Sequence, residues 1–202
     1  MPTYSQQQLL DVLFKQTEAL LDVAIKEWQL LSHPEFASKP TPGAWSANEC
    51  LQHLNNYGRY YLPAISKAMQ HHPTTPAQQF RSGWLGNYFT KIMLPKQDGK
   101  LRLLMKSPQD YAPTSILESH VVIAEFIDQQ EQLLRLISEA GAVDLNSVRV
   151  GISLAPIVKL KLGDVFLFLI AHEVRHVDQA RRALKSLKQT SMIDGMLSLL
   201  KF

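Results

Sequence analysis

The sequence predicts an all-α protein, a four-helix bundle in which one long crossover connection joins the second helix to the third. Three observations lead to this prediction. Apolar residues recur at spacings of three and four over four long stretches. Proline, glycine and helix-capping residues separate these stretches. Valine and isoleucine cluster at residues 148–152, but this segment is too short to build a sheet.

The first two helices are predicted from their apolar stripes and their ends. Residues 5–31 carry a single apolar stripe, and the pair His33-Pro34 should end this helix, because the residue before a proline disfavours helical backbone. Ser46 and Glu49 stand three residues apart and form a capping box. A second helix is therefore expected to begin at Ser46 and to run to about residue 70.

Residues 71–113 form the predicted crossover connection, which is basic and rich in proline. This segment holds five of the eleven prolines and has a net charge of +4, from six basic and two acidic side chains. A connection of this length inside a compact domain is usually functional or carries some structure of its own. We expect a short helix within residues 83–94.

The third and fourth helices complete the predicted bundle. The third covers about residues 114–139 and places His120 on its apolar seam. The fourth begins near Asp164, a good N-cap residue, and runs to about residue 188. Residues 189–202 form an apolar C-terminal tail, which we expect to dock on the bundle or on a partner.

Composition narrows the class of protein. The 202 residues are 46% hydrophobic and 19% charged, which predicts one domain over residues 1–202 with a sizeable core. A net charge of +3 is too small to indicate nucleic-acid binding. The chain has one cysteine, Cys50, and shows neither a signal peptide nor a membrane span. We therefore expect a cytoplasmic protein that binds neither nucleic acid nor membrane.

His172 and His176 are the strongest candidates for metal ligands. They stand four residues apart on a predicted helix, so both imidazoles project from one face, as two ligands of one divalent ion do. The apolar run before them, residues 165–171, predicts that this stretch is buried. His53, one to two turns into the second helix, can supply a third ligand, and Tyr57 shares its face.

The string His172-Glu173-Val174-Arg175-His176 also matches the H-E-x-x-H motif of zinc peptidases, in which the glutamate acts as general base. Such enzymes need a third ligand, generally downstream of the motif. Residues 177–202 contain neither histidine nor glutamate. We therefore disfavour a zinc peptidase and interpret Glu173 as a solvated helix residue.

Two segments resemble the DinB-like superfamily, the four-helix bundles of the damage-inducible and bacillithiol-transferase type. Residues 42–54 read PGAWSANECLQHL and resemble the second-helix signature of that family, and residues 163–179 read GDVFLFLIAHEVRHVDQ and resemble its fourth-helix signature. In the family, one histidine of the second helix and two of the fourth bind a divalent metal. His53, His172 and His176 fill these positions.

The resemblance implies a divalent metal, zinc or nickel, and a role in stress or detoxification. Three imidazole ligands leave a coordination position open for a water or a thiol, whose pKa the metal lowers. Thiol transfer and hydrolysis are therefore both open, and we expect a small-molecule substrate such as a low-molecular-weight thiol. A homodimer is expected, because the apolar tail needs cover. The alternative is a non-catalytic metal-binding or ligand-binding module that dimerises.

Other side chains are candidates for the surroundings of this metal site. His120 lines the pocket, serves as a fourth ligand, or is a satisfied core histidine. Tyr57 lies one turn beyond His53, and Gln179, about one turn beyond His176, can orient a ligand through a hydrogen bond. The sequence does not assign a catalytic residue.

Overall fold

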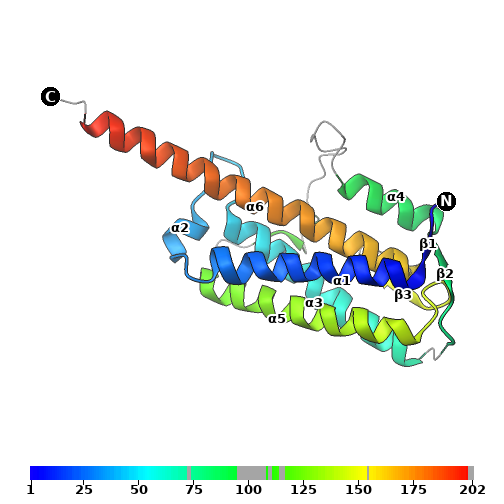
Figure 1. The fold of residues 1–202 in the computed structure, drawn as a ribbon. Coiled ribbons are helices and arrows are strands. Elements are labelled where there is room, and N and C mark those ends of the chain that lie inside the picture. The colour runs from blue at the N-terminus through cyan, green and yellow to red at the C-terminus, as the bar shows by residue number, and fades with distance from the viewer. Residues whose placement is uncertain (72–73, 95–107, 109–110, 114–116, 154, 200–202) are drawn as a thin grey trace.

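Four long helices make up most of the structure (Figure 1). The computed structural model describes residues 1–71, 74–94, 108, 111–113, 117–153 and 155–199, with the backbone alone for 156 and 188–199. The long helices are α1 (Gln6–Val23), α3 (Ala47–His71), α5 (Ser119–Glu139) and α6 (Leu162–Leu199). Both α1 and α3 contact α5 and α6, so the predicted helical fold class is confirmed.

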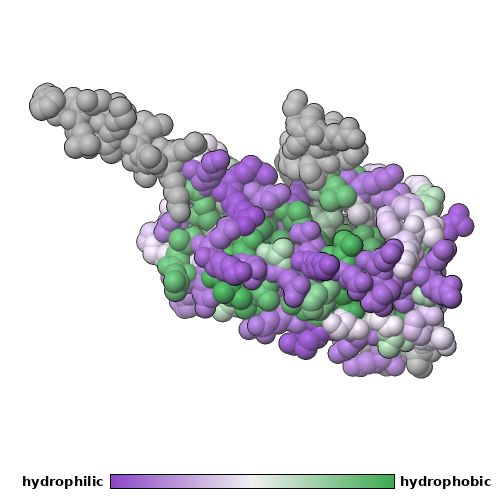
Figure 2. Space-filling model, viewed as in Figure 1, coloured by the Kyte–Doolittle hydropathy of each residue, from purple (hydrophilic) through white to green (hydrophobic). Residues whose placement is uncertain are grey.

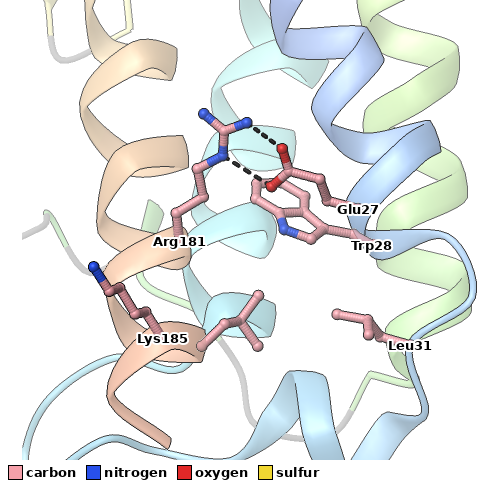
Figure 3. Close-up of a pocket in the computed structure, with 6 residues that line it drawn as sticks. Glu27, Trp28, Leu31, Arg181 and Lys185 are labelled. Carbon is pink, nitrogen blue, oxygen red and sulfur yellow. Dashed lines mark hydrogen bonds and ion pairs between the residues drawn. The ribbon is translucent and has the colours of Figure 1, made fainter. Parts of the chain in front are cut away.

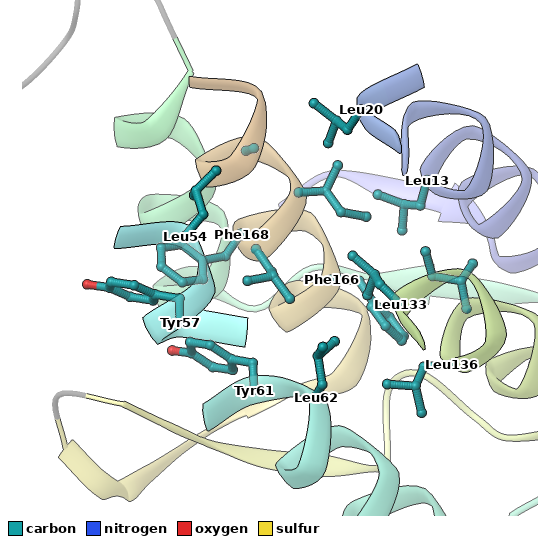
Figure 4. Close-up of a cluster of buried hydrophobic side chains, with 14 of the residues drawn as sticks. Leu13, Leu20, Leu54, Tyr57, Tyr61, Leu62, Leu133, Leu136, Phe166 and Phe168 are labelled. Carbon is teal, nitrogen blue, oxygen red and sulfur yellow. The ribbon is translucent and has the colours of Figure 1, made fainter. Parts of the chain in front are cut away.

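The four long helices share an apolar core, because each turns its apolar stripe toward the others. Figure 4 shows Leu13 and Leu20 of α1, Leu133 and Leu136 of α5 and Phe166 of α6 pointing into one cluster, and all five are buried. On the face shown in Figure 2, the apolar side chains that reach the surface are interspersed with polar ones. The periodic stripes of the sequence therefore locate the core correctly.

The end of the first helix differs from the prediction. After α1, the chain continues in a π-helical turn, η1 (Ala24–Trp28). The pair His33-Pro34 does not end a helix but begins one, α2 (His33–Ala37). Proline fits the first turn of a helix because its missing N–H would have no intrahelical partner there. The restriction on the residue before proline was thus the wrong rule for this site.

The predicted capping box begins α3. The Ser46 N–H donates to Oε2 of Glu49 at 2.8 Å, and the Glu49 N–H donates to Oγ of Ser46 at 3.2 Å. Nζ of Lys39 lies 2.8 Å from Oε1 of the same carboxylate. Burial pushes the pKa of Glu49 upward, but these hydrogen bonds and the charge of Lys39 together lower it below the ordinary value of 4.5. Ionised Glu49 therefore stabilises the fold.

We expect Glu49→Ala to lower the free energy of unfolding by about 1 kcal/mol at pH 7, the usual cost of losing a helix cap. Because the folded-state pKa is lowered, the contribution of the charge is present above pH 4.5 and is lost as the pH falls through that lowered pKa. Urea unfolding of the wild type and the variant between pH 3 and pH 7 measures this. Glu49→Gln is the matched control, since it keeps an acceptor for the Ser46 N–H and removes only the charge. If the free energy of unfolding of the wild type and that of Glu49→Gln differ by the same amount at every pH in this range, the proposed role of the charge is contradicted.

The crossover connection carries structure in the part that is described. The strand β2 (Gln79–Arg81) pairs antiparallel with β1 (Thr3–Ser5) at the N-terminus of the chain. The predicted short helix is present as α4 (Trp84–Met93), which packs against α6. Residues 95–107 of the basic segment lie outside the described residues. The connection therefore contributes one more helix beside the site described below.

The prediction that residues 148–152 form no sheet is wrong. Here β3 (Arg149–Ile152) pairs antiparallel with β4 (Ala155–Lys161) in a two-stranded hairpin. Val150 and Leu160 stand opposite each other and are both buried. Two strands alone are marginal in water, so this hairpin depends on packing against α3 and α6. That packing is tertiary, and the short apolar run gave no sign of it.

Asp164 does not cap the fourth helix, which corrects another prediction. Since α6 begins at Leu162, Asp164 lies within its first turn. Its carboxylate accepts hydrogen bonds from Oγ of Ser82 at 2.5 Å and from the N–H of Gly83 at 2.9 Å. Gly86 permits this close approach, because a Cβ there would lie 2.3 Å from Cβ of Asp164. Asp164 therefore holds the start of α4 on α6.

The fourth long helix is longer than predicted. The segment expected to be a separate tail instead continues α6 to Leu199, and only residues 200–202 lie outside the described part. In Figure 1 the C-terminal end of α6 extends beyond the ends of the other long helices. The expected docking of the tail on the bundle is therefore wrong for the backbone of residues 189–199. Among the helices described, none combines the length and apolar character that crossing a membrane requires.

Candidate metal centre

Three histidines from two long helices meet in the interior. His53 comes from α3 and His172 and His176 come from α6, and all three are buried. One ring nitrogen of each lies within 4.8 Å of the others, and Nε2 of His53 is 3.1 Å from Nε2 of His172. The apolar residues of α6 that precede His172 are buried in the core, which fixes this turn of the helix against α3. The structure thus brings together the three histidines that the sequence singled out.

The surroundings keep the three imidazoles neutral. Burial lowers the pKa of His172 well below its ordinary value and that of His176 to about 3, and the other histidines and Arg175 add to the effect. Burial also lowers the pKa of His53, against the opposing effect of its hydrogen bond to Tyr111. A neutral imidazole has a lone pair on one ring nitrogen, which is what a metal ion requires.

A backbone carbonyl fixes the tautomer of His53. Nδ1 of His53 lies 2.7 Å from the carbonyl oxygen of Tyr111. A carbonyl can only accept, so Nδ1 carries the proton and Nε2 keeps its lone pair, the arrangement typical of histidine ligands. Among the described residues, Nδ1 of His172 and Nδ1 of His176 are buried without a hydrogen-bond partner.

This nitrogen cluster fits a divalent cation. A zinc ion bound by imidazoles at about 2.0–2.1 Å holds their nitrogens about 3.3 Å apart. The 3.1 Å between His53 and His172 is close to this spacing. The three-histidine group can therefore hold a metal ion, and an all-imidazole donor set suits zinc or nickel.

Aromatic rings surround the histidine cluster. The ring centroid of Tyr57 lies 4.6 Å from that of His172 and 5.0 Å from that of His53. Trp45 stacks on His176 at 5.7 Å, and Phe168 stacks on His172 at 5.9 Å. These rings exclude water from one side of the cluster and lower the local dielectric, which strengthens electrostatic interactions inside the site.

Sequence reasoning missed four contributors to these surroundings: Trp45, Tyr111, Phe168 and Arg175. Phe168 stands four residues before His172 on the same helix, so helical spacing could have indicated it. Arg175 donates from Nη1 to the carbonyl of Ile92 in α4, at 3.2 Å. The contact between Tyr111 and His53 joins positions far apart in the chain, and no local sequence pattern predicts it.

The predicted neighbours of the site have different outcomes. Tyr57 lies against the histidines, as expected from its position one turn after His53. Gln179 is half-buried about one turn beyond His176 on the same helix, and its side chain acts to raise the pKa of that histidine, against the larger effect of burial. His120 is exposed on α5, so the prediction that it lines the pocket, serves as a fourth ligand or lies in the core is wrong. Ser119, Val122 and Ile123 of the same turn are buried, so His120 lies on the opposite, solvent-facing side of α5.

Glu173 is buried, which overturns its interpretation as a solvated residue. Its Oε1 accepts a hydrogen bond from Nε2 of Gln130 on α5 at 3.2 Å, and burial raises its pKa to about 8. Successive helical residues are turned by about 100°, so Glu173 faces α5 while His172 faces α3. The glutamate is outside the group that can hold an ion. This geometry does not fit an H-E-x-x-H peptidase, whose glutamate faces the metal.

Cys50 does not offer an alternative reactive group. The side chain is fully buried, and burial raises the pKa of the thiol to about 12. A thiol with that pKa is almost entirely protonated at neutral pH, and the thiolate is the nucleophilic form. Thiol chemistry at this site would therefore need a thiol from the substrate.

A hollow of about 490 Å³ lies away from the histidine cluster, between η1 and α6 (Figure 3). Its only carboxylate, that of Glu27, is held by the guanidinium of Arg181, whose Nε donates to Oε2 at 3.0 Å while Nη2 pairs with Oε1. The remaining lining residues are Trp28, Leu31, Leu184 and Lys185. Among the side chains that the structure describes, this hollow contributes no metal-ligating cluster, so the histidine group is the better candidate for chemistry.

Comparisons with known proteins agree with the motifs. The family model described as the DinB superfamily matches residues 13–180, a span that includes all three histidines of the cluster. No curated protein and no solved structure gives a significant match. Because the matched span covers most of the 202 residues, the chain belongs to the DinB superfamily.

Proposed function

We propose that this protein is a divalent-metal-dependent enzyme that transfers a small thiol to an electrophile, with hydrolysis as the alternative reaction. The observation that carries the proposal is the buried group of His53, His172 and His176. Structural zinc sites use four protein ligands, whereas three ligands leave a position open for a reactant. A zinc or nickel ion there supplies Lewis acidity toward a thiol or a water.

The protein's own side chains support a reaction on a small molecule. His53 is oriented by the Tyr111 carbonyl, and Gln179 stands about one turn beyond His176 on the same helix. Tyr57 and Phe168 exclude water from one side of the cluster. The buried, protonated Cys50 leaves the nucleophile to be supplied by the substrate. A low-molecular-weight thiol is the substrate class that these features favour.

The test is thiol-dependent loss of monochlorobimane with protein that has been stripped of metal and reloaded with zinc or nickel. Cysteine, glutathione, coenzyme A and bacillithiol are compared as thiols. We expect turnover with at least one of them in the reloaded wild type and in His120→Ala, and none in His53→Ala. Hydrolysis of p-nitrophenyl acetate without added thiol would instead select the hydrolase.

Two outcomes separate the rival functions. Stoichiometric metal without turnover of any thiol or ester would favour the non-catalytic binding module. A wild type that retains neither zinc nor nickel would reject the metal-dependent proposal altogether. Glu173→Gln should leave turnover unchanged, because Glu173 faces α5 rather than the histidine cluster.

A further inference from the structure

A small cavity adjoins the histidine cluster on the side of α4 and the β3–β4 hairpin. Its volume is about 50 Å³. Four of the side chains that line it are aromatic, and the others are apolar apart from Ser153. The lining residues that carry the argument are Tyr57, Tyr61, Phe89, Ile92, Ile152 and Phe168.

The cavity and the histidine cluster share two walls. Tyr57 and Phe168 line the cavity, and their rings also lie 4.6 Å and 5.9 Å from the ring of His172. In Figure 4 the rings of Tyr57 and Tyr61 lie one above the other and point the same way, with Phe168 on α6 beside them. No histidine lines the cavity itself, so Tyr57 and Phe168 are the side chains through which it adjoins the cluster.

We propose that this cavity is a subsite for a short aliphatic group of the substrate that reacts at the histidine cluster. The inference deepens the proposed function and rests on it for the reacting end of the substrate. An apolar cavity of about 150 Å³ accepts benzene. A volume of about 50 Å³ is a third of that and has room for an alkyl group of about two carbons.

One end of the cavity is polar and rigid. The hydroxyl of Tyr61 accepts a hydrogen bond from the N–H of Ser153 at 3.2 Å, and Oγ of Ser153 lies 3.5 Å from the same hydroxyl. This ties the hairpin turn to α3 and fixes the length of the recess. Phe89 closes another side, where its ring packs against Phe168 at 6.0 Å. The subsite therefore selects by chain length.

The experiment titrates n-alkyl hydroxamates of two to eight carbons into protein labelled with 3-fluorotyrosine, with and without bound zinc. Hydroxamates bind metals, and the fluorine resonances of Tyr57 and Tyr61, assigned through Tyr→Phe variants, report on the cavity. In zinc-loaded protein we expect affinity to rise about fourfold for each methylene buried, up to about three carbons, and then to level off. In metal-free protein propionohydroxamate should still shift Tyr61 at millimolar concentration, whereas acetohydroxamate should not.

Variants of α4 test the walls. Ile92→Phe should abolish the rise of affinity with chain length, and Phe89→Ala should move the plateau to longer chains. Val12→Phe is the matched control, because Val12 is 63% exposed on α1 and should leave the series unchanged. Circular dichroism establishes that each variant is folded, and the wild-type series decides the question even if a variant is not.

The outcomes distinguish this subsite from the proposed function. Equal affinity for all chain lengths together with an unmoved Tyr61 resonance would overturn the subsite. A wild type that does not bind zinc would overturn the proposed function, and the metal-free titration would then decide the subsite by itself.

Discussion

His176→Ala will bind zinc or nickel more than a hundredfold more weakly than the wild type. Altering residues that merely support metal ligands costs about 10- to 100-fold in affinity, so removing a ligand should cost more. With His176 gone, His53 and His172 leave two imidazoles, which is one fewer than catalytic zinc sites use. Metal content after dialysis, measured by elemental analysis, gives the occupancy of each protein.

Thermal unfolding measures the loss of metal binding in His176→Ala in a second way. A ligand present at 100 times its Kd stabilises a folded protein by about 2.7 kcal/mol, which in a domain of this size raises Tm by about 8 °C. Zinc should therefore raise the Tm of the wild type and leave that of His176→Ala unchanged. His120→Ala is the matched control, since it removes an exposed histidine from α5. Retention of stoichiometric metal by His176→Ala would remove this site from consideration.

Phe166→Ala will lower the free energy of unfolding by about 4 kcal/mol, because it removes a large side chain from the middle of the core. Phe166 is fully buried and lies among side chains of α1 and α5 in Figure 4. The structure around such a site relaxes only partly, so a cavity adds to the lost burial of the ring. Urea unfolding of metal-free protein, followed by circular dichroism, measures the loss.

Two further variants make this measurement specific to the core. Leu30→Ala removes an apolar side chain that is 96% exposed, and it should change stability by less than about 0.5 kcal/mol. Phe166→Leu should recover more than half of the loss, since it refills most of the volume. A loss below about 1 kcal/mol in Phe166→Ala would show that α6 is not anchored through this residue.

The helices could be predicted because their signals are local. The capping box of Ser46 and Glu49 places the start of α3 to within a residue, and the apolar stripe of α1 marks the face that is buried. Both signals depend on residues three or four apart, which one turn of helix brings together. The same spacing put His172 and His176 on one face of α6.

The errors lie where a residue's role depends on a distant partner. Asp164 has the chemistry of a helix cap, but its partners are Ser82 and Gly83, which come from a different part of the chain. Glu173 looks like a solvated residue on a helix, and only the packing of α5 against that face shows that it is buried. His120 is the opposite case. It lies on the predicted apolar seam of α5, but the packing of the helices leaves it exposed to solvent.

The candidate metal centre depends on both local patterns and tertiary packing. Residue types and helical spacing are enough to name His53, His172 and His176, because an imidazole pair on one helix face is a local pattern and the family motif adds the third. The Tyr111 carbonyl on His53, the aromatic walls and the small cavity beside them arise from contacts between α3, α4, α6 and the hairpin. Such contacts form only when the helices pack, so the orientation of the ligands and the shape of the recess belong to the tertiary structure.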